Sequence, residues 1–253
     1  MKIAYRREGR GAPVLLIHGV GGDSGNWGPI AARLQRRFDV IAMDLRGHGR
    51  SDLITGPVQA HDLARDAAQV LDECGVAASA VVGFSLGGTV AQALALDFPG
   101  RVARLAVMGS PCGRTPEERA RALERIEFLK AHGAPALAEA NRERWFTDEF
   151  RGAHPDAVER RVDQVKACDP ASYLYAFTVF CTADFADRLP EIRVATLVVT
   201  GEHDVAATPR MARLMGERIG ASQVRVLPRL RHSLLIEAPA QVGELLEGFL
   251  GNH

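Results

Sequence analysis

The sequence predicts an α/β fold with a doubly wound, mostly parallel sheet, and two patterns along its 253 residues support this. Short apolar runs alternate with helical segments up to about residue 111, and the alternation resumes at about residue 190. The apolar runs are continuous, as expected of strands that are buried on both faces of a parallel sheet. Residues 112–189 contain no such run. We therefore expect a core of residues 1–111 and 190–253 and an inserted helical lid of residues 112–189.

The expected core strands are separated by helices or glycine-rich loops, and the first of them lies near a sheet edge. They span residues 3–6, 14–17, 40–43, 80–82, 105–108, 195–200 and 223–227. The expected core helices span residues 27–36, 61–74, 87–97, 209–219 and 240–250. In the lid, the helical pattern covers residues 117–132, 135–145, 155–167 and 170–179.

The balance of charged residues indicates which binding partners the protein lacks. The chain has 31 basic and 31 acidic residues and no basic run, which argues against nucleic acid or a membrane surface as a partner. The first residues lack the apolar stretch of a signal peptide, and no apolar run reaches membrane-spanning length. The four cysteines are scattered and form no Cys-x-x-Cys pair. These features predict a cytoplasmic protein with reduced thiols.

The segment around Ser85 has the form of a nucleophile elbow. An apolar β-branched run leads into Gly83-x-Ser85-x-Gly87, and an alanine-rich helical pattern follows. In such a turn the serine hydroxyl projects above the sheet, and the glycines allow the chain to turn tightly. A glycine-rich strand-to-helix turn without catalytic function would show the same short pattern.

Two further residues complete a candidate catalytic set. Asp204 and His232 each follow a predicted parallel strand, as Ser85 does, so all three lie at the same rim of the sheet. Serine, acid and histidine in this order match an α/β-hydrolase triad. Glu202 is an alternative acid, and His203 and His48 are alternative histidines. His48 lies in a polar turn, where local hydrogen bonds alone would account for it.

Several motifs together resemble the α/β-hydrolase superfamily and span nearly the whole chain outside the lid. They are His18-Gly19, Asp44-x-Arg46-Gly47-His48-Gly49-x-Ser51, the Ser85 elbow, Gly201-Glu202-x-Asp204, and His232 before Glu237-x-Pro239. The lid segment 143–147 and the later segment 186–190 resemble the 3-oxoadipate enol-lactonase subgroup. The loop at residues 19–24 departs from that lactonase. The family's usual first edge strand is absent, so we expect about seven strands.

The resemblance implies acyl transfer through a covalent intermediate on Ser85. His232 would accept the serine proton, and Asp204 would orient the imidazole. The backbone N–H groups of Val20 and Leu86 would stabilise the oxyanion. No metal or organic cofactor is required for this chemistry.

A small-molecule ester or enol-lactone is the expected substrate, with Trp27, Arg144 and Trp145 as candidate binding residues. An arginine that faces the cavity could pair with a substrate carboxylate, although a solvated helix face would carry the same arginines. Hydrolysis of a carbon–carbon bond in ring-cleavage products, or cofactor-free haloperoxidase or perhydrolase chemistry, would use the same triad. A ligand-binding protein that keeps this fold is the non-enzymatic alternative.

Overall fold

The computed structural model describes residues 1–251, which contain one seven-stranded sheet of order β1-β3-β2-β4-β5-β6-β7. Every neighbouring pair of strands is parallel except β1 and β3, which are antiparallel. The predicted mostly parallel sheet is therefore confirmed. The strands are β1 Tyr5–Gly9, β2 Ala12–Ile17, β3 Phe38–Met43, β4 Ser79–Phe84, β5 Val102–Met108, β6 Thr196–Gly201 and β7 Ser222–Leu227.

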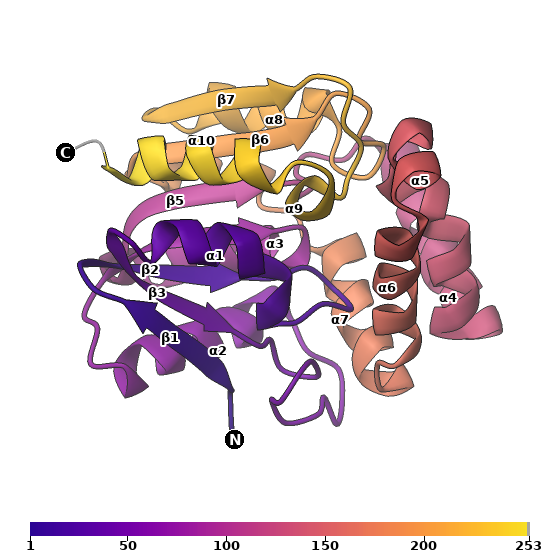
Figure 1. The fold of residues 1–253 in the computed structure, drawn as a ribbon, viewed down its shortest axis with the longest axis horizontal. Helices are drawn as coiled ribbons and strands as arrows, with labels where there is room; N and C mark the ends of the chain where they lie inside the picture. The colour runs from indigo at the N-terminus through magenta and orange to yellow at the C-terminus, as the bar shows by residue number, and fades with distance from the viewer. Residues whose placement is uncertain (252–253) are drawn as a thin grey trace.

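Helices cover both faces of the sheet (Figure 1). One face carries α1 Gly28–Leu34 and α10 Pro239–Gly251. The opposite face carries α2 Ala60–Glu73, α3 Leu86–Asp97 and α8 Pro209–Arg218. The short α9 spans Leu234–Glu237, and 3-10 turns span Ser24–Trp27, Pro99–Arg101 and Ala186–Glu191. This arrangement is the doubly wound α/β architecture.

Alternate side chains of one strand supply the two halves of the core. In β2, Leu15 and Ile17 pack with the α2–α3 side, whereas Val14 and Leu16 pack with the α1–α10 side. All four are almost completely buried, because a central parallel strand is covered on both faces. Burying each such side chain contributes about 1.5–3 kcal/mol. The buried sheet thus fixes the positions at which the loops at its carboxyl ends begin.

The first strand differs from the predicted span of residues 3–6, because the paired segment is Tyr5–Gly9. Lys2 and Ala4, which precede this strand, are each tied to the segment after β3 by two hydrogen bonds. Their carbonyls accept from the N–H groups of Asp52 at 3.0 Å and Asp44 at 2.8 Å. Ala4 N–H donates to Ser51 Oγ at 2.9 Å, and Lys2 N–H donates to the Asp52 carboxylate at 2.7 Å. These contacts use side-chain acceptors, which a pattern of apolar residues does not reveal.

A helical insertion separates β5 from β6 and lies at the edge where the parallel strands end (Figure 1). It contains α4 Pro116–Trp145, α5 Asp148–Ala153, α6 Pro155–Lys166 and α7 Pro170–Thr182. The predicted helices 117–132 and 135–145 are two arms of α4, which is kinked at Gly133, where φ is 78°. Neither α5 nor α9 was expected, since four to six residues are too short to show helical periodicity.

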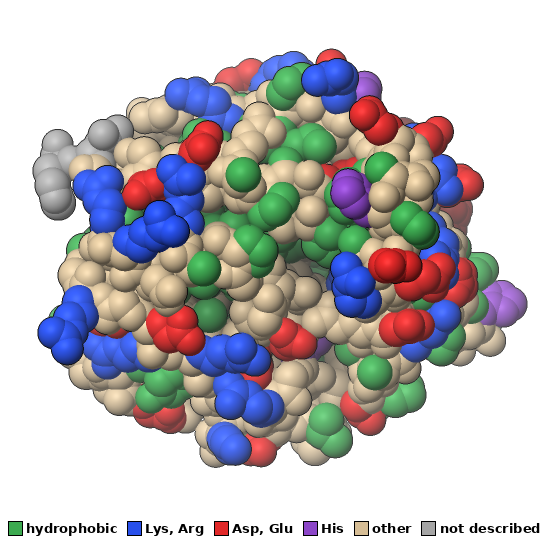
Figure 2. Space-filling view, in the orientation of Figure 1, with side chains coloured by type: hydrophobic (Ala, Val, Ile, Leu, Met, Phe, Trp, Pro, Cys, Tyr) green, Lys and Arg blue, Asp and Glu red, His purple; other side chains and the backbone are tan. Residues whose placement is uncertain are grey.

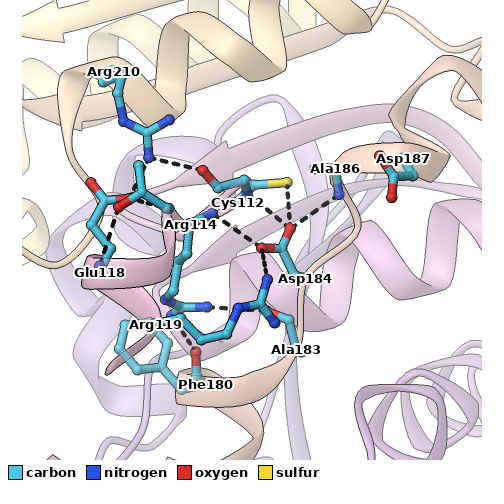
Figure 3. A network of polar contacts seen from close by, with 12 residues as sticks. Cys112, Arg114, Glu118, Arg119, Phe180, Ala183, Asp184, Ala186, Asp187 and Arg210 are labelled. Atoms are coloured by element: carbon cyan, nitrogen blue, oxygen red, sulfur yellow. Dashed lines mark hydrogen bonds and ion pairs between the residues drawn. The ribbon is translucent and has the colours of Figure 1, made fainter. Parts of the chain in front are cut away.

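Asp184 ties together the points where the chain enters and leaves the insertion (Figure 3). Its carboxylate accepts hydrogen bonds from the N–H groups of Gly113 at 2.8 Å, Arg114 at 3.1 Å and Ala186 at 3.1 Å. The Arg114 guanidinium donates to the carbonyl of Phe180 at 2.8 Å. The two ends of the insertion are therefore fixed to one another.

Within residues 1–251, no helix combines the length and the apolar character needed to cross a membrane. All four cysteines are free thiols, of which Cys112 and Cys181 are buried.

Candidate active site

Ser85 lies at the apex of a strand–turn–helix unit formed by β4 and α3. Its φ of 55° is in the left-handed region, which costs a residue with a side chain about 1–3 kcal/mol. The turn is held by the Ser85 N–H, which donates to the Met108 carbonyl at 2.8 Å. A Cβ atom at Gly83 would lie 2.1 Å from the Gly87 carbonyl oxygen, and one at Gly87 would lie 2.1 Å from the Ile17 oxygen. Both positions therefore require glycine.

The structure brings Ser85, His232 and Asp204 together from three separate loops. His232 Nε2 lies 3.1 Å from Ser85 Oγ, and His232 Nδ1 lies 2.7 Å from Asp204 Oδ2. The other oxygen, Oδ1, accepts from the N–H groups of Ala206 at 2.8 Å and Ala207 at 3.0 Å. All three residues are at most 7% exposed. The carboxylate is therefore held by backbone N–H groups as well as by the imidazole.

The alternative acid and histidine lie elsewhere. Glu202 is exposed, and its carboxylate accepts from the Arg229 N–H at 2.8 Å. His203 is also exposed, and its Nε2 lies 3.8 Å from Glu202. Neither residue contacts His232 among the described residues. Asp204 is the acid that the fold brings to the imidazole.

Two further histidines, His18 and His48, are buried beneath the loop after β2. His48 Nε2 accepts from the Gly21 N–H at 2.9 Å, and His18 Nε2 accepts from the Leu45 N–H at 2.9 Å. Burial lowers the pKa of both side chains, and that of His48 falls to about 3. Each Nε2 must remain unprotonated to accept its hydrogen bond. Both histidines are thus neutral and support the loop.

The N–H groups of Val20 and Leu86 have no acceptor within residues 1–251. Leu86 is the first residue of α3, and the first N–H groups of a helix have no intrahelical acceptor. Val20 borders the same small cavity as Ser85 and His232. These unpaired donors suit a negatively charged oxygen, which the helix dipole also favours.

Two adjoining cavities lie between the core and the insertion. A small one of about 50 Å³ is bordered by Ser85 and His232, and a larger, open one of about 1150 Å³ lies beside it. They share five lining residues, namely Arg125, Arg144, Phe177, Phe180 and Ala206. Figure 2 shows acidic and basic side chains gathered on the side of the molecule where the insertion lies. The larger cavity therefore adjoins the small cavity at Ser85.

The candidate binding residues have different surroundings. Arg144 borders both cavities, and Trp145 borders the small one. Trp27 is completely buried, in the same hydrophobic cluster as Ile30 and Leu34, and borders neither cavity. The fold thus brings Arg144 and Trp145 to Ser85, and Trp27 belongs to the core.

The neighbouring arginines differ in their partners. Arg142 pairs with Glu139 and Glu159, and Arg151 pairs with Asp148 at 2.9 Å. Arg144 forms no hydrogen bond or ion pair with any residue that the structure describes. Burial lowers the pKa of Arg144, although the charge of Asp204 opposes this shift. Its guanidinium is consequently available to a ligand.

Sequence reasoning missed two arginines of the site, Arg125 and Arg161, which both border the small cavity. Arg125 donates to Asn141 Oδ1 at 2.5 Å, and Arg161 lies 5.0 Å from the centre of the Trp145 ring. Both lie on helices rich in charged residues, and such a pattern is typical of a solvated helix face. No feature of the sequence distinguished them.

The fold and the site define an α/β hydrolase. The family described as alpha/beta hydrolase fold matches residues 12–239, and the chain belongs to this family. RutD of Azorhizobium caulinodans, which is named as a candidate carbamate hydrolase, is 31% identical over 250 residues, 98% of this chain and 94% of its own length. 3-Oxoadipate enol-lactonase 1 of Acinetobacter baylyi is 27% identical over 240 residues, 94% of this chain and 89% of its own.

The structure is also similar to that of the enol-lactonase from Burkholderia xenovorans LB400. The TM-score is 0.91 with 28% sequence identity, and the match covers 99% of this chain and 96% of the enol-lactonase. Both the core and the insertion therefore have counterparts in that protein.

Proposed function

We propose that this protein is a serine hydrolase that cleaves a small carboxylic ester or enol-lactone through an acyl-enzyme, as a 3-oxoadipate enol-lactonase-like enzyme. One observation carries the proposal: the continuous hydrogen-bond path from Asp204 through His232 to Ser85 Oγ. A histidine that can accept the serine proton on one nitrogen while a carboxylate holds the other is the arrangement that activates a serine nucleophile.

In the proposed reaction, Ser85 Oγ attacks the carbonyl carbon while its proton passes to His232 Nε2. The carbonyl oxygen becomes an oxyanion, and the N–H groups of Val20 and Leu86 bind it. The imidazolium then returns the proton to the leaving oxygen, and an acyl group remains on Ser85. Water attacks the acyl-enzyme with His232 as the base, which releases the acid and restores the serine. Asp204 stabilises the imidazolium in both steps.

The substrate in this proposal carries a carboxylate. Arg144 supports this, because its guanidinium borders both cavities and has no acidic partner within residues 1–251. A guanidinium can bind a carboxylate through two parallel hydrogen bonds. Arg125 adds a second positive charge to the same cavity wall, and Trp145 adds an apolar surface. The similarity to proteins named as 3-oxoadipate enol-lactonases agrees with an acidic lactone.

The insertion acts as the lid in this proposal, with residues 112–189 as the lid and residues 1–111 and 190–253 as the hydrolase core. Side chains of α4, α6 and α7 border the small cavity from the side opposite Ser85, including Trp145, Arg161 and Phe177. Such a cover keeps water away from the oxyanion and strengthens the hydrogen bonds that it receives. The lid residues would thereby select which carbonyl compound reaches Ser85.

Hydrolysis of p-nitrophenyl acetate by the wild type and by Ser85→Ala tests the proposed function. We expect turnover and labelling by a fluorophosphonate only where Ser85 is present, because the probe reacts with an activated serine. Ser233→Ala is the matched control, since Ser233 borders the same cavity and makes no contact with His232 through its hydroxyl. Equal activity of the wild type and Ser85→Ala would disprove the proposal. A panel of neutral esters, carboxylate esters and enol-lactones then defines the substrate.

A further inference from the structure

We propose that Arg161 of α6 is a positioning residue for the reaction: it holds the loop of residues 19–22 so that the Val20 N–H can bind the oxyanion. This inference rests on the proposed hydrolase function. It assigns a catalytic consequence to a lid residue that lies far from Ser85 in the sequence.

Arg161 makes a pair of hydrogen bonds to this loop. Its Nη2 donates to the Val20 carbonyl at 2.8 Å, and its Nη1 donates to the Gly21 carbonyl at 2.5 Å. A guanidinium is planar and presents its donors in a fixed fork, so it can hold two successive carbonyls in one geometry. No carboxylate within residues 1–251 forms an ion pair with Arg161. Its role is therefore not that of an ordinary salt bridge.

Hydrogen bonds also hold the rest of the loop. From the core side, the Gly21 N–H donates to His48 Nε2 at 2.9 Å. The Gly19 carbonyl lies 2.7 Å from His18 Nδ1 and accepts from the Gly22 N–H at 3.1 Å. Two neutral histidines thus support the loop from below.

Among the donors at positions 20 to 22, the one without a partner in the described chain is the Val20 N–H. The loop is clamped by Arg161 on the side of the insertion and by His48 on the side of the core. A donor that is fixed before the reaction stabilises an oxyanion without any cost of reorganisation. Arg161 and the histidines would supply this preorganisation.

The guanidinium of Arg161 also lies at the cavity itself. It stacks over the Trp145 ring at 5.0 Å, and it borders the small cavity together with Ser85. Burial lowers the pKa of Arg161, but a guanidinium stays protonated at neutral pH. The proposed site thus has a positive charge at the wall of the cavity in which the oxyanion forms, which adds a favourable electrostatic contribution.

Arg161 differs from Arg144 in a way that separates their roles. Both terminal nitrogens of Arg161 are used by carbonyl oxygens, and Nη1 also donates to Gln164 Oε1 at 3.0 Å. Gln164 in turn donates to the Asp23 carboxylate at 2.8 Å, just after the loop. Arg161 is therefore built into the structure, whereas Arg144 is free to bind a substrate carboxylate.

The test compares Arg161→Ala and Arg161→Lys with Arg160→Ala. Arg160 is the adjacent exposed arginine, and within residues 1–251 it forms no hydrogen bond with the loop. Loss of a whole oxyanion donor costs a factor of about 10²–10³, so we expect kcat of Arg161→Ala to fall by about tenfold to a hundredfold. KM for a neutral p-nitrophenyl ester should change by less than about threefold, because the donor acts in the transition state.

Added guanidinium ion at non-denaturing concentration provides the decisive measurement. We expect it to restore part of kcat in Arg161→Ala and to leave the wild type and Arg160→Ala unchanged. Arg161→Lys should keep an intermediate kcat, since an ammonium retains the charge but lacks the fork. If Arg161→Ala fails to fold, the test is the comparison of Arg161→Lys with the wild type, in which the kcat of Arg161→Lys should be reduced.

Three results would overturn the inference. They are a wild-type kcat in a folded Arg161 variant, a loss confined to KM, and a loss that guanidinium does not recover in Arg161→Ala. Failure of the proposed function has a different signature, because the wild-type protein would then show no fluorophosphonate labelling at Ser85.

Discussion

The Asp204 carboxylate and the His232 imidazole are joined by a hydrogen bond of 2.7 Å, in which Nδ1 donates to Oδ2. The second carboxylate oxygen is held by the N–H groups of Ala206 and Ala207. Because both residues are buried, water does not compete for this contact. The contact fixes the imidazole with Nε2 directed at Ser85 Oγ, 3.1 Å away.

Asp204→Asn should therefore lower kcat by about 10³–10⁴, because an amide can donate to Nδ1 and favour the wrong tautomer of His232. KM should change little. Steady-state hydrolysis of p-nitrophenyl acetate measures both quantities. Glu202→Gln is the matched control, since Glu202 is exposed and, within residues 1–251, its carboxylate pairs with Arg229 and His203 and not with His232. If Glu202→Gln lost activity and Asp204→Asn kept it, Glu202 would be the catalytic acid.

Arg144→Gln should reduce kcat/KM for a carboxylate-bearing ester by about tenfold to a hundredfold, the value of a hydrogen bond to a charged group. For a neutral ester of similar size, kcat/KM should stay within about twofold, because no carboxylate is present to lose its partner. The comparison of the two substrates measures charge recognition separately from folding.

Arg142→Gln provides the control for this change. Arg142 lies on the same helix, but it pairs with Glu139 and Glu159 and borders neither cavity. Both esters should therefore be hydrolysed as by the wild type. An equal loss for the neutral and the charged ester in Arg144→Gln would contradict carboxylate recognition by Arg144.

The sequence predicted the core because its strands are unbroken apolar runs and its helices show a clear period. It also predicted that Ser85, Asp204 and His232 follow parallel strands, and this topology is enough to bring them to one rim. The predicted start of β1 was two residues too early, because the Ala4 N–H donates to the Ser51 side chain and not to a strand carbonyl. Side-chain acceptors of this kind are determined by tertiary contacts.

The surroundings of single side chains could not be predicted from the sequence. Trp27 follows a rim loop, at the end of the 3-10 turn Ser24–Trp27, but it is completely buried in the same hydrophobic cluster as Ile30 and Leu34. Arg161 has charged neighbours along its helix, as a solvated residue would, and only the packing of α6 on the 19–22 loop shows its contacts. Contacts between the insertion and the core leave no periodic pattern in the sequence from which they could be predicted.

Asp184→Ala should lower the free energy of unfolding by about 2–3 kcal/mol, because partly buried backbone donors would lose their acceptor. Urea denaturation measures this change. The N–H groups of Gly113 and Arg114 on one side, and of Ala186 on the other, lose the carboxylate that joins them (Figure 3). Asp187→Ala is the control, since Asp187 is fully exposed. Equal stabilities of the two variants would show that the connection contributes nothing.

The stability that the Asp184 carboxylate contributes should depend on pH. Burial raises the pKa of Asp184, but the hydrogen bonds from Gly113, Ala186 and Arg114 outweigh it, and the pKa is lowered overall. A carboxyl whose pKa is lower in the folded state contributes stability above its unfolded pKa and loses it as the pH falls. The difference in stability between the wild type and Asp184→Ala should therefore shrink on acidification. A difference that grew would contradict the lowered pKa.

The stability of the folded protein should fall as the pH decreases from about 6.5 towards about 3, partly because of His48. Over this range the unfolded chain binds a proton at His48, whereas the folded protein excludes it, because the ring is buried and Nε2 accepts the Gly21 N–H. Stability therefore rises with pH through the window between the folded and the unfolded pKa of His48.

His48→Gln removes the titrating ring but keeps an acceptor, so the melting temperature of this variant should fall less steeply on acidification. The exposed His132 makes no such bond, and His132→Gln should reproduce the wild-type slope. Identical slopes for the wild type and His48→Gln would show that His48 binds its proton in the folded state, and the support of the 19–22 loop by a neutral ring would then be wrong.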